Sequence, residues 1–200
     1  MKIIGITGPT GAGKSLLSES LAQKQIPVID ADRVYHSLLI PPSPCLDALR
    51  LSFGDGIFHG DGTLNRPALS EIVFSDEEKL RLLNQTVLGM VLEKIREQIC
   101  ELGKQGKQVV AVDAPTLIES GFDGECDVVV SVLAPADLRL QRIMARDQLS
   151  EERARLRIQG QMDDTFYRSH SHYVLINDKD RSRLESELQR LMTDLLGPQS

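Results

Sequence analysis

The sequence lacks long hydrophobic runs. Its apolar stretches, such as Val109 to Val112, are only a few residues long, whereas a helix that crosses a bilayer needs about 20 apolar residues. Met1 and Lys2 stand directly before a short apolar segment, and no extended hydrophobic stretch with a small-residue cleavage site follows them. We therefore expect no membrane partner, no transmembrane segment and no cleaved leader.

Cysteine is also scarce. The three cysteines, Cys45, Cys100 and Cys126, are an odd number, lie far apart in the chain and form no C-x-x-C pair. This usage suggests neither a disulfide framework nor a zinc site. We expect a cytoplasmic protein in a reducing compartment.

Positive charge is in deficit. The chain has 23 Lys and Arg against 29 Asp and Glu, which gives a formal net charge of −6. This balance argues against a general affinity for nucleic acid or for an anionic membrane surface. The composition, with 41% hydrophobic and 26% charged residues, is near the average of soluble globular proteins, and 200 residues suffice for one domain with a small insertion.

Short β-branched runs alternate with longer stretches of helical period along the chain. This alternation predicts an α/β fold in which helices cover a parallel sheet. Each candidate strand is flanked by polar or turn residues. The five strands that we expect are Lys2–Thr7, Val28–Asp30, Gln108–Asp113, Asp127–Leu133 and Tyr173–Ile176.

No convincing core strand lies between the second and third predicted strands. About 75 residues lie there, too many for an ordinary loop, and they include Pro41 to Pro44 and a glycine-rich turn from Gly54 to Gly62. They predict an inserted helical subdomain. Within it, apolar residues at spacings of three and four predict a long helix over Asp76–Cys100, which Gly103 and Gly106 would end.

Further helices are expected after the fourth strand. Pro135 can occupy an early helical position, and Arg139, Arg142 and Arg146 then share one face of that helix. Another helix begins at Ser150. A leucine stripe predicts a terminal helix that packs on the core, and its members are Leu184, Leu188, Leu191 and Leu195.

One glycine-rich segment matches a known phosphate-binding motif. Gly8 to Ser15 matches G-x-x-x-x-G-K-[ST] and lies between an apolar strand and the amphipathic segment Leu16 to Gln23, which is the context that a P-loop needs. Glycines let backbone N–H groups point at one phosphate, Lys14 reaches the β- and γ-phosphates, and the Ser15 hydroxyl is the expected Mg²⁺ ligand. The ATP contacts that we expect here are Gly8, Gly11, Ala12, Gly13, Lys14, Ser15 and Leu16.

The P-loop predicts that the protein binds a nucleoside triphosphate, but several classes of protein share this motif. A GTPase would show N-K-x-D after a late strand, whereas Asn177 to Asp180 reads in the wrong order and the only D-x-x-G is at Asp194 to Gly197. The chain is too short for the accessory domains of most motors. A helical insertion and an arginine-bearing helix suit a kinase, which needs an acceptor site and a lid.

Two carboxylates end the second predicted strand. Asp30 and Asp32 would point to the same side if the strand is still extended, at the edge of a parallel sheet where ligands bind. Asp32 is our candidate for the base that takes the proton of an attacking hydroxyl, and Asp30 is a supporting group. A helix N-cap is the alternative role, and the two roles can coexist. Asp113, at the end of the third strand, could hold Mg²⁺ through water or accept a cap or turn hydrogen bond.

The chain resembles the dephospho-CoA kinase family over nearly its whole length. The matching segments are Gly5–Ser15, Val28–Asp32, Asp61–Arg66, Ile72–Phe74, Asp113–Glu119, Gln141–Asp147, Arg157–Gln159 and Asn177. The resemblance implies a P-loop NTPase fold with α/β/α layers, whose core would comprise residues 1–32, 105–138 and 169–200. It also implies a helical CoA-binding insertion over residues 33–104 and a helical lid over residues 139–168.

The resemblance further implies Mg²⁺-dependent transfer of the ATP γ-phosphate to the ribose 3′-hydroxyl of dephospho-CoA, the last step of coenzyme A synthesis. ATP and dephospho-CoA would be the partners. By motif position, Asp32 would be the catalytic base, Lys14 and Arg142 would assist catalysis, and Arg142, Arg146 and Asn177 would bind ATP. Expected acceptor contacts are Asp30, Asp32, Arg66, Pro115, Leu117 and Glu119. For Arg142 and Arg146, a solvated face paired to carboxylates is the alternative.

Two segments depart from the family pattern. Leu88 and Gly89 stand where the family has histidine and proline, and His172 stands in place of an acid. These changes bear on acceptor affinity and adenine recognition more than on kinase class. The other functions considered are a P-loop kinase for another nucleoside or nucleotide hydroxyl and a non-catalytic ATP-binding regulator. Intact Lys14, Ser15 and Asp32 argue against the regulator. We expect a monomer or a weak homo-oligomer.

Overall fold

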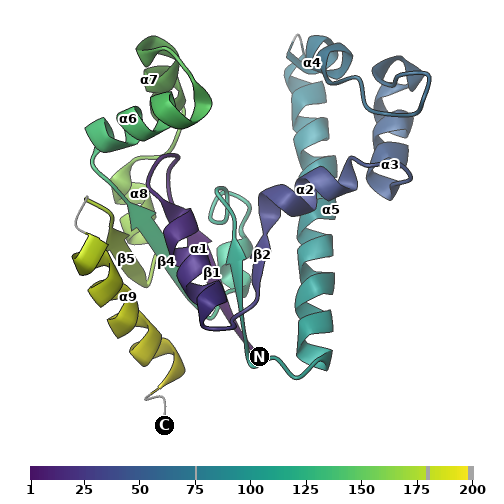
Figure 1. Cartoon of the computed structure of the whole chain (residues 1–200). Helices are drawn as coiled ribbons and strands as arrows, with labels where there is room; N and C mark the ends of the chain where they lie inside the picture. Colours follow the sequence, from purple (N-terminus) through teal and green to yellow (C-terminus); the bar gives the residue numbers. More distant parts are fainter. Residues whose placement is uncertain (75, 179–180, 198–200) are drawn as a thin grey trace. The chain divides into compact units, whose positions relative to one another are not determined.

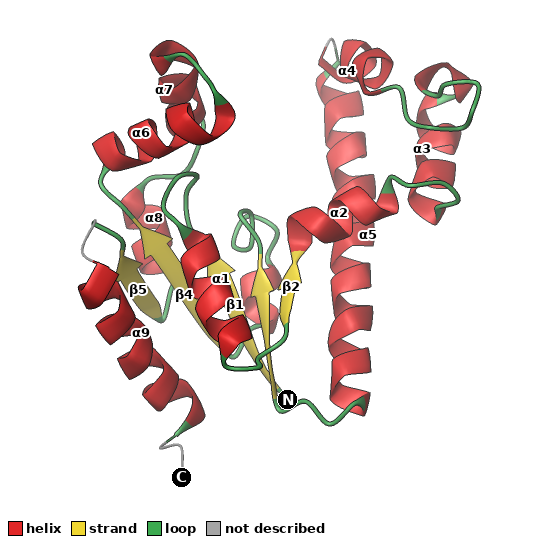
Figure 2. Ribbon diagram, viewed as in Figure 1, coloured by secondary structure: helices red, strands yellow, loops and turns green. Residues whose placement is uncertain are grey.

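The computed structural model describes residues 1–74, 76–178 and 181–197 (Figure 1). The chain divides into two compact units, Met1–Val28 with Lys107–Ser200, and Ile29–Gly106. The first unit contains most of the sheet, and the second is helical (Figure 2). Among the described residues, no helix combines the length and the apolarity that crossing a membrane requires.

Five strands form one sheet in the order β2-β3-β1-β4-β5. They are β1 (Lys2–Thr7), β2 (Val28–Asp30), β3 (Val109–Asp113), β4 (Val128–Leu133) and β5 (Tyr173–Ile176). β1 runs parallel to β3 and β4, with Ile4 paired to Ala111 and Val128, and β4 runs parallel to β5. The predicted α/β fold with five parallel strands is confirmed, and no strand boundary differs from its prediction by more than one residue.

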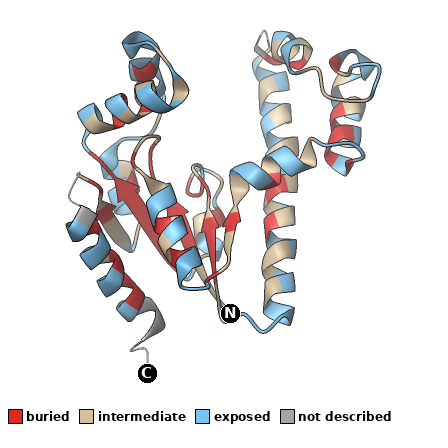
Figure 3. Ribbon diagram, in the orientation of Figure 1, coloured by how far each residue is buried: buried red, intermediate tan, exposed pale blue. Residues whose placement is uncertain are grey.

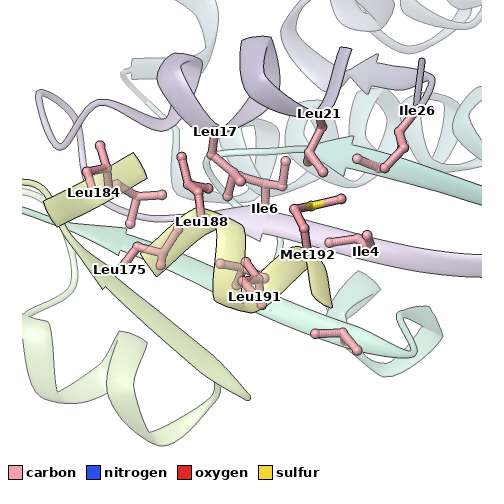
Figure 4. Packing of buried hydrophobic residues seen from close by; sticks show 14 of the residues in the cluster. Ile4, Ile6, Leu17, Leu21, Ile26, Leu175, Leu184, Leu188, Leu191 and Met192 are labelled. Atoms are coloured by element: carbon pink, nitrogen blue, oxygen red, sulfur yellow. The ribbon is translucent and has the colours of Figure 1, made fainter. Parts of the chain in front are cut away.

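Helices cover both faces of the sheet, because alternate residues of a buried strand point to opposite faces. On one face, Ile4 and Ile6 pack with Leu17 and Leu21 of α1 (Lys14–Gln23) and with α9 (Arg181–Leu196) (Figure 4). On the other face, Tyr167 of α8 (Asp164–Ser169) packs with Leu133. Burial is continuous along β4 (Figure 3).

The terminal helix is part of this core, as its leucine stripe predicts. Leu184, Leu188 and Leu191 are 4%, 6% and 3% exposed. The side chain of Leu195, the fourth member of the stripe, lies outside the part of the chain that the structure describes. The stripe therefore serves packing rather than partner binding over its described length.

Two helices follow β4. α6 (Ala136–Asp147) begins after Pro135, and α7 (Glu151–Gln159) begins after Ser150, whose Oγ accepts the N–H of Arg153 at 3.4 Å. Each helix begins within one residue of its prediction. The two helices pack on each other through Leu140, Ile143 and Ala154. A short 3₁₀ turn, η2 (Phe122–Glu125), precedes β4.

The second unit consists of helices with their own core. They are α2 (Ala31–Leu38), α3 (Pro44–Phe53), η1 (Asp55–Ile57), α4 (Arg66–Phe74) and α5 (Glu77–Lys104). The core includes Cys45, Leu49, Ile57 and Leu69, with residues of α5 packed against it. Apart from residue 75, which is not described, residues 31–106 contain no strand and only one isolated bridge, between Phe58 and Leu64.

The long predicted helix is confirmed as α5, although it ends later than expected. Asp76 caps it by accepting the N–H groups of Glu78 and Lys79 at 3.0 and 3.1 Å. Gly103 lies inside the last turn and does not end the helix. The chain turns at Gly106, which has a φ of 81° that suits glycine.

The three cysteines are free and differ in their surroundings. Cys45 has no exposed surface and lies in the core of the second unit. Cys126 packs against β1 beside Gly5, where a Cβ on Gly5 would be 2.8 Å from its Sγ. Burial is the main cause that raises the pKa of Cys126 to about 12, and nearby Asp123 adds to it. Cys100 is exposed on α5.

Removing one leucine of the α9 stripe tests how much this packing stabilises the first unit. We expect Leu188→Ala to lower the free energy of unfolding by about 2–4 kcal/mol, because it leaves a cavity among buried side chains. The matched control is Leu156→Ala on α7, whose side chain is 61% exposed. Urea unfolding of both variants measures the difference, and equal values would contradict the assignment of Leu188 to the core.

Candidate active site

The loop between β1 and α1 depends on glycine. Gly8 and Gly13 have φ values of 136° and 96°, a region that L side chains rarely adopt. A Cβ on Gly8 would lie 2.2 Å from the carbonyl oxygen of Val132, and one on Gly13 would lie 2.2 Å from Nδ2 of Asn177. The loop therefore passes so close to β4 and to Asn177 that a side chain does not fit.

The positive end of α1 faces this loop. Lys14 is the first residue of α1, and its Nζ donates to the carbonyl oxygen of Gly8 at 3.3 Å. Ser15 follows and is exposed. Backbone N–H groups and the helix dipole attract anions at such a terminus. The N–H groups of Ala12 and Leu16 donate to the carbonyl oxygens of Pro9 and Gly13 at 3.2 and 3.1 Å.

Arg142 and Asn177 cover the outer side of the loop. Arg142 donates from Nη1 to the carbonyl oxygens of Gly11 and Ala12 at 3.1 and 3.2 Å. Its Nη2 donates to Oδ1 of Asn177 at 3.2 Å. Asn177 is 6% exposed and donates from Nδ2 to the carbonyl oxygen of Ala12 at 2.8 Å. The structure thus brings Arg142 and Asn177, two predicted ATP contacts, onto the P-loop.

Two further side chains contact the loop and were not predicted as site residues. Nε of Arg139 donates to the carbonyl oxygen of Thr10 at 3.0 Å, and Oε1 of Gln161 accepts the N–H of Thr10 at 2.9 Å. Arg139 shares a helix face with Arg142, which is a signal that could have identified it. Gln161 lies 151 residues from Thr10 in the sequence, and no local pattern points to it.

Arg146 lies one turn beyond Arg142 and is exposed. Its Nε and Nη2 donate to the carboxylate of Asp147 at 2.7 and 2.9 Å, and Nη2 also donates to Oγ1 of Thr10 at 3.4 Å. Arg157 forms an ion pair with the same carboxylate. The hydrogen bond from Arg146 is the main cause that lowers the pKa of Asp147. The carboxylate pairing that we considered as the alternative is therefore present.

The carboxyl end of β3 places Asp113 beside α1. Its Oδ2 accepts the hydroxyl of Ser18, 95 residues away in the sequence, at 2.6 Å, which is neither the cap nor the turn hydrogen bond considered as its alternative role. In the turn that follows, Pro115 is half-buried and Glu119 is exposed. Leu117 has no exposed surface and packs beside Gly5, where a Cβ would lie 2.6 Å from its Cδ2. The side chain of Leu117, which we expected in the acceptor site, therefore belongs to the core.

In the second unit, Asp30 caps α2. Its Oδ1 accepts the N–H of Arg33 at 3.1 Å, while Asp32 lies exposed in the first turn of the helix. The strand is not extended as far as Asp32, which was the condition for both carboxylates to point to one side, because the helix begins at Ala31 and changes the side-chain period from 2 to 3.6. The N-cap role holds for Asp30.

The remaining predicted positions lie on helices or at a strand end. Arg66 is the first residue of α4 and is exposed. Within α5, Leu88 is half-buried and Gly89 is exposed. His172 precedes β5, and its Nδ1 accepts the N–H of Val129 at 3.0 Å. In this structure His172 therefore joins β5 to β4.

Replacing Gly13 tests whether this backbone geometry binds phosphate. We expect Gly13→Ala to weaken ATP binding by about tenfold or more, because the new Cβ would collide with Asn177 and strain a φ of 96°. Titration calorimetry measures the affinity. Gly124→Ala is the control, since a Cβ there meets nothing within 4 Å. Equal ATP affinity in the two variants would show that ATP binding does not depend on the backbone geometry at Gly13.

Comparison with known proteins gives consistent results. A curated dephospho-CoA kinase of Symbiobacterium thermophilum is 39% identical over 162 residues, which cover 81% of this chain and 68% of the relative. A solved structure from Thermus thermophilus has a TM-score of 0.81 and 33% identity. The dephospho-CoA kinase from Campylobacter jejuni has a TM-score of 0.71 and 26% identity. Each of these two alignments covers 98% of both chains.

The family match extends over nearly the whole chain. The family model described as dephospho-CoA kinase matches residues 2–182, a range that includes the P-loop, the helical second unit and the arginines of α6. The resemblance carried by the sequence motifs is thereby confirmed. The chain belongs to the dephospho-CoA kinase family.

Proposed function

We propose that this protein transfers the γ-phosphate of ATP to the ribose 3′-hydroxyl of dephospho-CoA and releases coenzyme A and ADP, the final step of coenzyme A synthesis. The observation that carries the proposal is the family match over residues 2–182. The P-loop supports it, because its glycines, Lys14 and the N-terminus of α1 form a site for the phosphates of a nucleotide.

The arginines of α6 would act on the triphosphate. Arg142 already lies on the P-loop backbone, within 3.2 Å of two of its carbonyl oxygens, and Arg146 is one turn away. Guanidinium groups neutralise the charge that spreads over the phosphate oxygens during transfer. Residues 139–168 would contain the lid, whose closure excludes water and so suppresses hydrolysis of ATP. The two buried ends of this range, Arg139 and Tyr167, would stay with the core.

The donors near the P-loop fit Mg²⁺ held together with the nucleotide. The described residues contain no group of three or more His, Cys, Asp or Glu that could hold a metal by itself. Ser15 offers an exposed hydroxyl and Asp113 a carboxylate at the end of β3, both hard oxygen donors of the kind Mg²⁺ accepts beside phosphates. When bound, the ion would neutralise phosphate charge, with Ser15 as its ligand and Asp113 acting through water.

Asp32 would serve as the base. Its exposed carboxylate in the first turn of α2 takes the proton of the 3′-hydroxyl as that oxygen attacks the γ-phosphorus. The bond between the γ-phosphorus and the bridging oxygen breaks, and ADP leaves with the electron pair. Asp30 supports this turn as its cap, because its carboxylate holds the N–H of Arg33.

The acceptor would be bound by the exposed residues predicted for it. Arg66 offers a cation at the start of α4 for anionic groups of dephospho-CoA, and Pro115 and Glu119 follow β3. Leu117 would act only by supporting this turn from the core. We further propose that the protein works in the cytoplasm as a monomer or a weak homo-oligomer, without nucleic-acid or membrane partners.

A coupled assay of ADP release tests the function directly. With Mg²⁺ and ATP, we expect rapid ADP release with dephospho-CoA and little with adenosine, AMP or no acceptor, and we expect coenzyme A as the product by mass spectrometry. If ADP is not released with dephospho-CoA but is released with another hydroxyl acceptor, the protein is a P-loop kinase with a different substrate. ATP binding without any turnover would instead favour a regulator.

Replacing Asp32 tests the base. We expect Asp32→Asn to lower kcat by about a hundredfold or more while ATP affinity stays the same, because general-base catalysis is lost. Asp30→Asn is a matched control, since asparagine also caps helices and only the charge is removed. We expect a smaller loss of kcat there. Unchanged turnover in Asp32→Asn would exclude Asp32 from the chemical step.

A further inference from the structure

Arg139 is buried in an unusual way for an arginine. It is 5% exposed, whereas arginine is almost never fully buried unless it is paired. The carboxylate nearest to it, on Asp164, lies 4.0 Å from Nη1 and is itself half exposed. Burial lowers the pKa of Arg139, although a guanidinium stays protonated in proteins. Its close hydrogen bonds go elsewhere.

Those hydrogen bonds form a closed triangle around Thr10. Nε of Arg139 donates to the carbonyl oxygen of Thr10 at 3.0 Å, and Nη2 donates to Oε1 of Gln161 at 3.3 Å. The same oxygen of Gln161 accepts the N–H of Thr10 at 2.9 Å. Thr10 is therefore fixed through both of its backbone polar groups by two side chains that also bind each other.

This triangle determines the direction of the next N–H group. In a planar trans peptide the C=O of one residue and the N–H of the next point in opposite directions. Because the carbonyl of Thr10 points at the guanidinium of Arg139, the N–H of Gly11 points away from that guanidinium. The same reasoning applies to the carbonyl of Ala12, which binds Arg142 and Asn177 and so directs the N–H of Gly13 away from them.

The backbone of α6 also touches the loop at this point. A Cβ on Gly11 would lie 2.8 Å from the carbonyl oxygen of Arg139 and 3.0 Å from its Cα. Gly11 has a φ of 77°, which favours glycine. Arg139 therefore lies against the loop through its backbone as well as its side chain, and its guanidinium has a fixed place from which to donate.

We infer that Arg139 is a positioning residue for phosphate binding, which fixes the Thr10–Gly11 peptide so that the N–H of Gly11 is directed at the phosphate before the nucleotide binds. The inference rests on the proposed use of ATP at this loop. It differs from the role of Arg142 and Arg146, which would meet phosphate oxygens themselves. Arg139 acts through the backbone and contacts no reacting atom.

Substitution of Arg139 separates this role from simple packing. Arg139→Met keeps much of the side-chain volume but removes every donor, and we expect it to weaken binding of both ATP and ADP by about tenfold or more, as for a lost charged hydrogen bond. The KM for ATP should rise more than kcat falls. Arg139→Lys, which can replace one of the two hydrogen bonds, should recover part of the affinity.

Two controls locate the effect. Asp164→Asn removes the carboxylate 4.0 Å from Arg139 and leaves the triangle intact, so ATP affinity should stay at the wild-type value. Arg155→Met removes an exposed arginine that pairs with Glu151 on α7 and should also bind ATP normally. Titration calorimetry suits all variants, since the stoichiometry reports the folded fraction separately from the Kd.

Gln161→Leu gives a second route if Arg139→Met does not fold. It removes the acceptor for the N–H of Thr10 and should weaken ATP binding in the same direction. In the double variant with Arg139→Lys, the loss should be smaller than the product of the two single losses, because both act on one peptide.

Three outcomes would overturn the inference. They are wild-type Kd values for ATP and ADP in folded Arg139→Met, an equal loss in Asp164→Asn, or a fall in kcat with KM unchanged. Failure of the proposed function would look different. The wild-type protein would then leave dephospho-CoA unphosphorylated, while the Kd values for ATP would still report on Arg139.

Discussion

The P-loop can bind phosphate only if its backbone N–H groups lie on the side of the phosphate and its carbonyl groups point to the other side. A short loop cannot do this alone, because each outward carbonyl needs a donor once it is shielded from water. Here the donors come from the end of β5 and from one face of α6: Asn177, Arg142 and Arg139 together bind the carbonyls of Thr10, Gly11 and Ala12. These three side chains thus hold the backbone of the anion site from the side opposite the phosphate.

The rest of the first unit positions these donors. β4 lies in contact with Gly8, and α6 follows β4 in the chain. The same strand therefore packs against the P-loop and positions the helix whose arginines bind it. β5 pairs with β4 in parallel and ends at Ile176, directly before Asn177. The apolar packing of α1 and α9 on the sheet keeps these strand ends in register, which matters because a hydrogen bond weakens steeply with misalignment.

The sequence predicted those features that local patterns encode. All five strands, the P-loop and the starts of α6 and α7 follow from runs, turn residues and spacing within a few residues. Burial of a polar side chain does not, because it depends on which elements meet: three arginines on one face of α6 range from the buried Arg139 to the exposed Arg146. For the same reason the sequence did not reveal that the side chain of Leu117 is buried beside Gly5 or that Gln161 contacts Thr10. It also did not reveal that α2 begins at Ala31, between Asp30 and Asp32.

The unequal burial of the three thiols has a practical consequence. Only a thiolate attacks an alkylating reagent, and Cys126, with a pKa near 12, and Cys45, enclosed in a core, offer almost none at neutral pH. Cys100, exposed on α5, remains as the reactive position. The wild-type chain therefore carries its own attachment point for a single fluorophore, placed in the unit that bears Asp32 and Arg66.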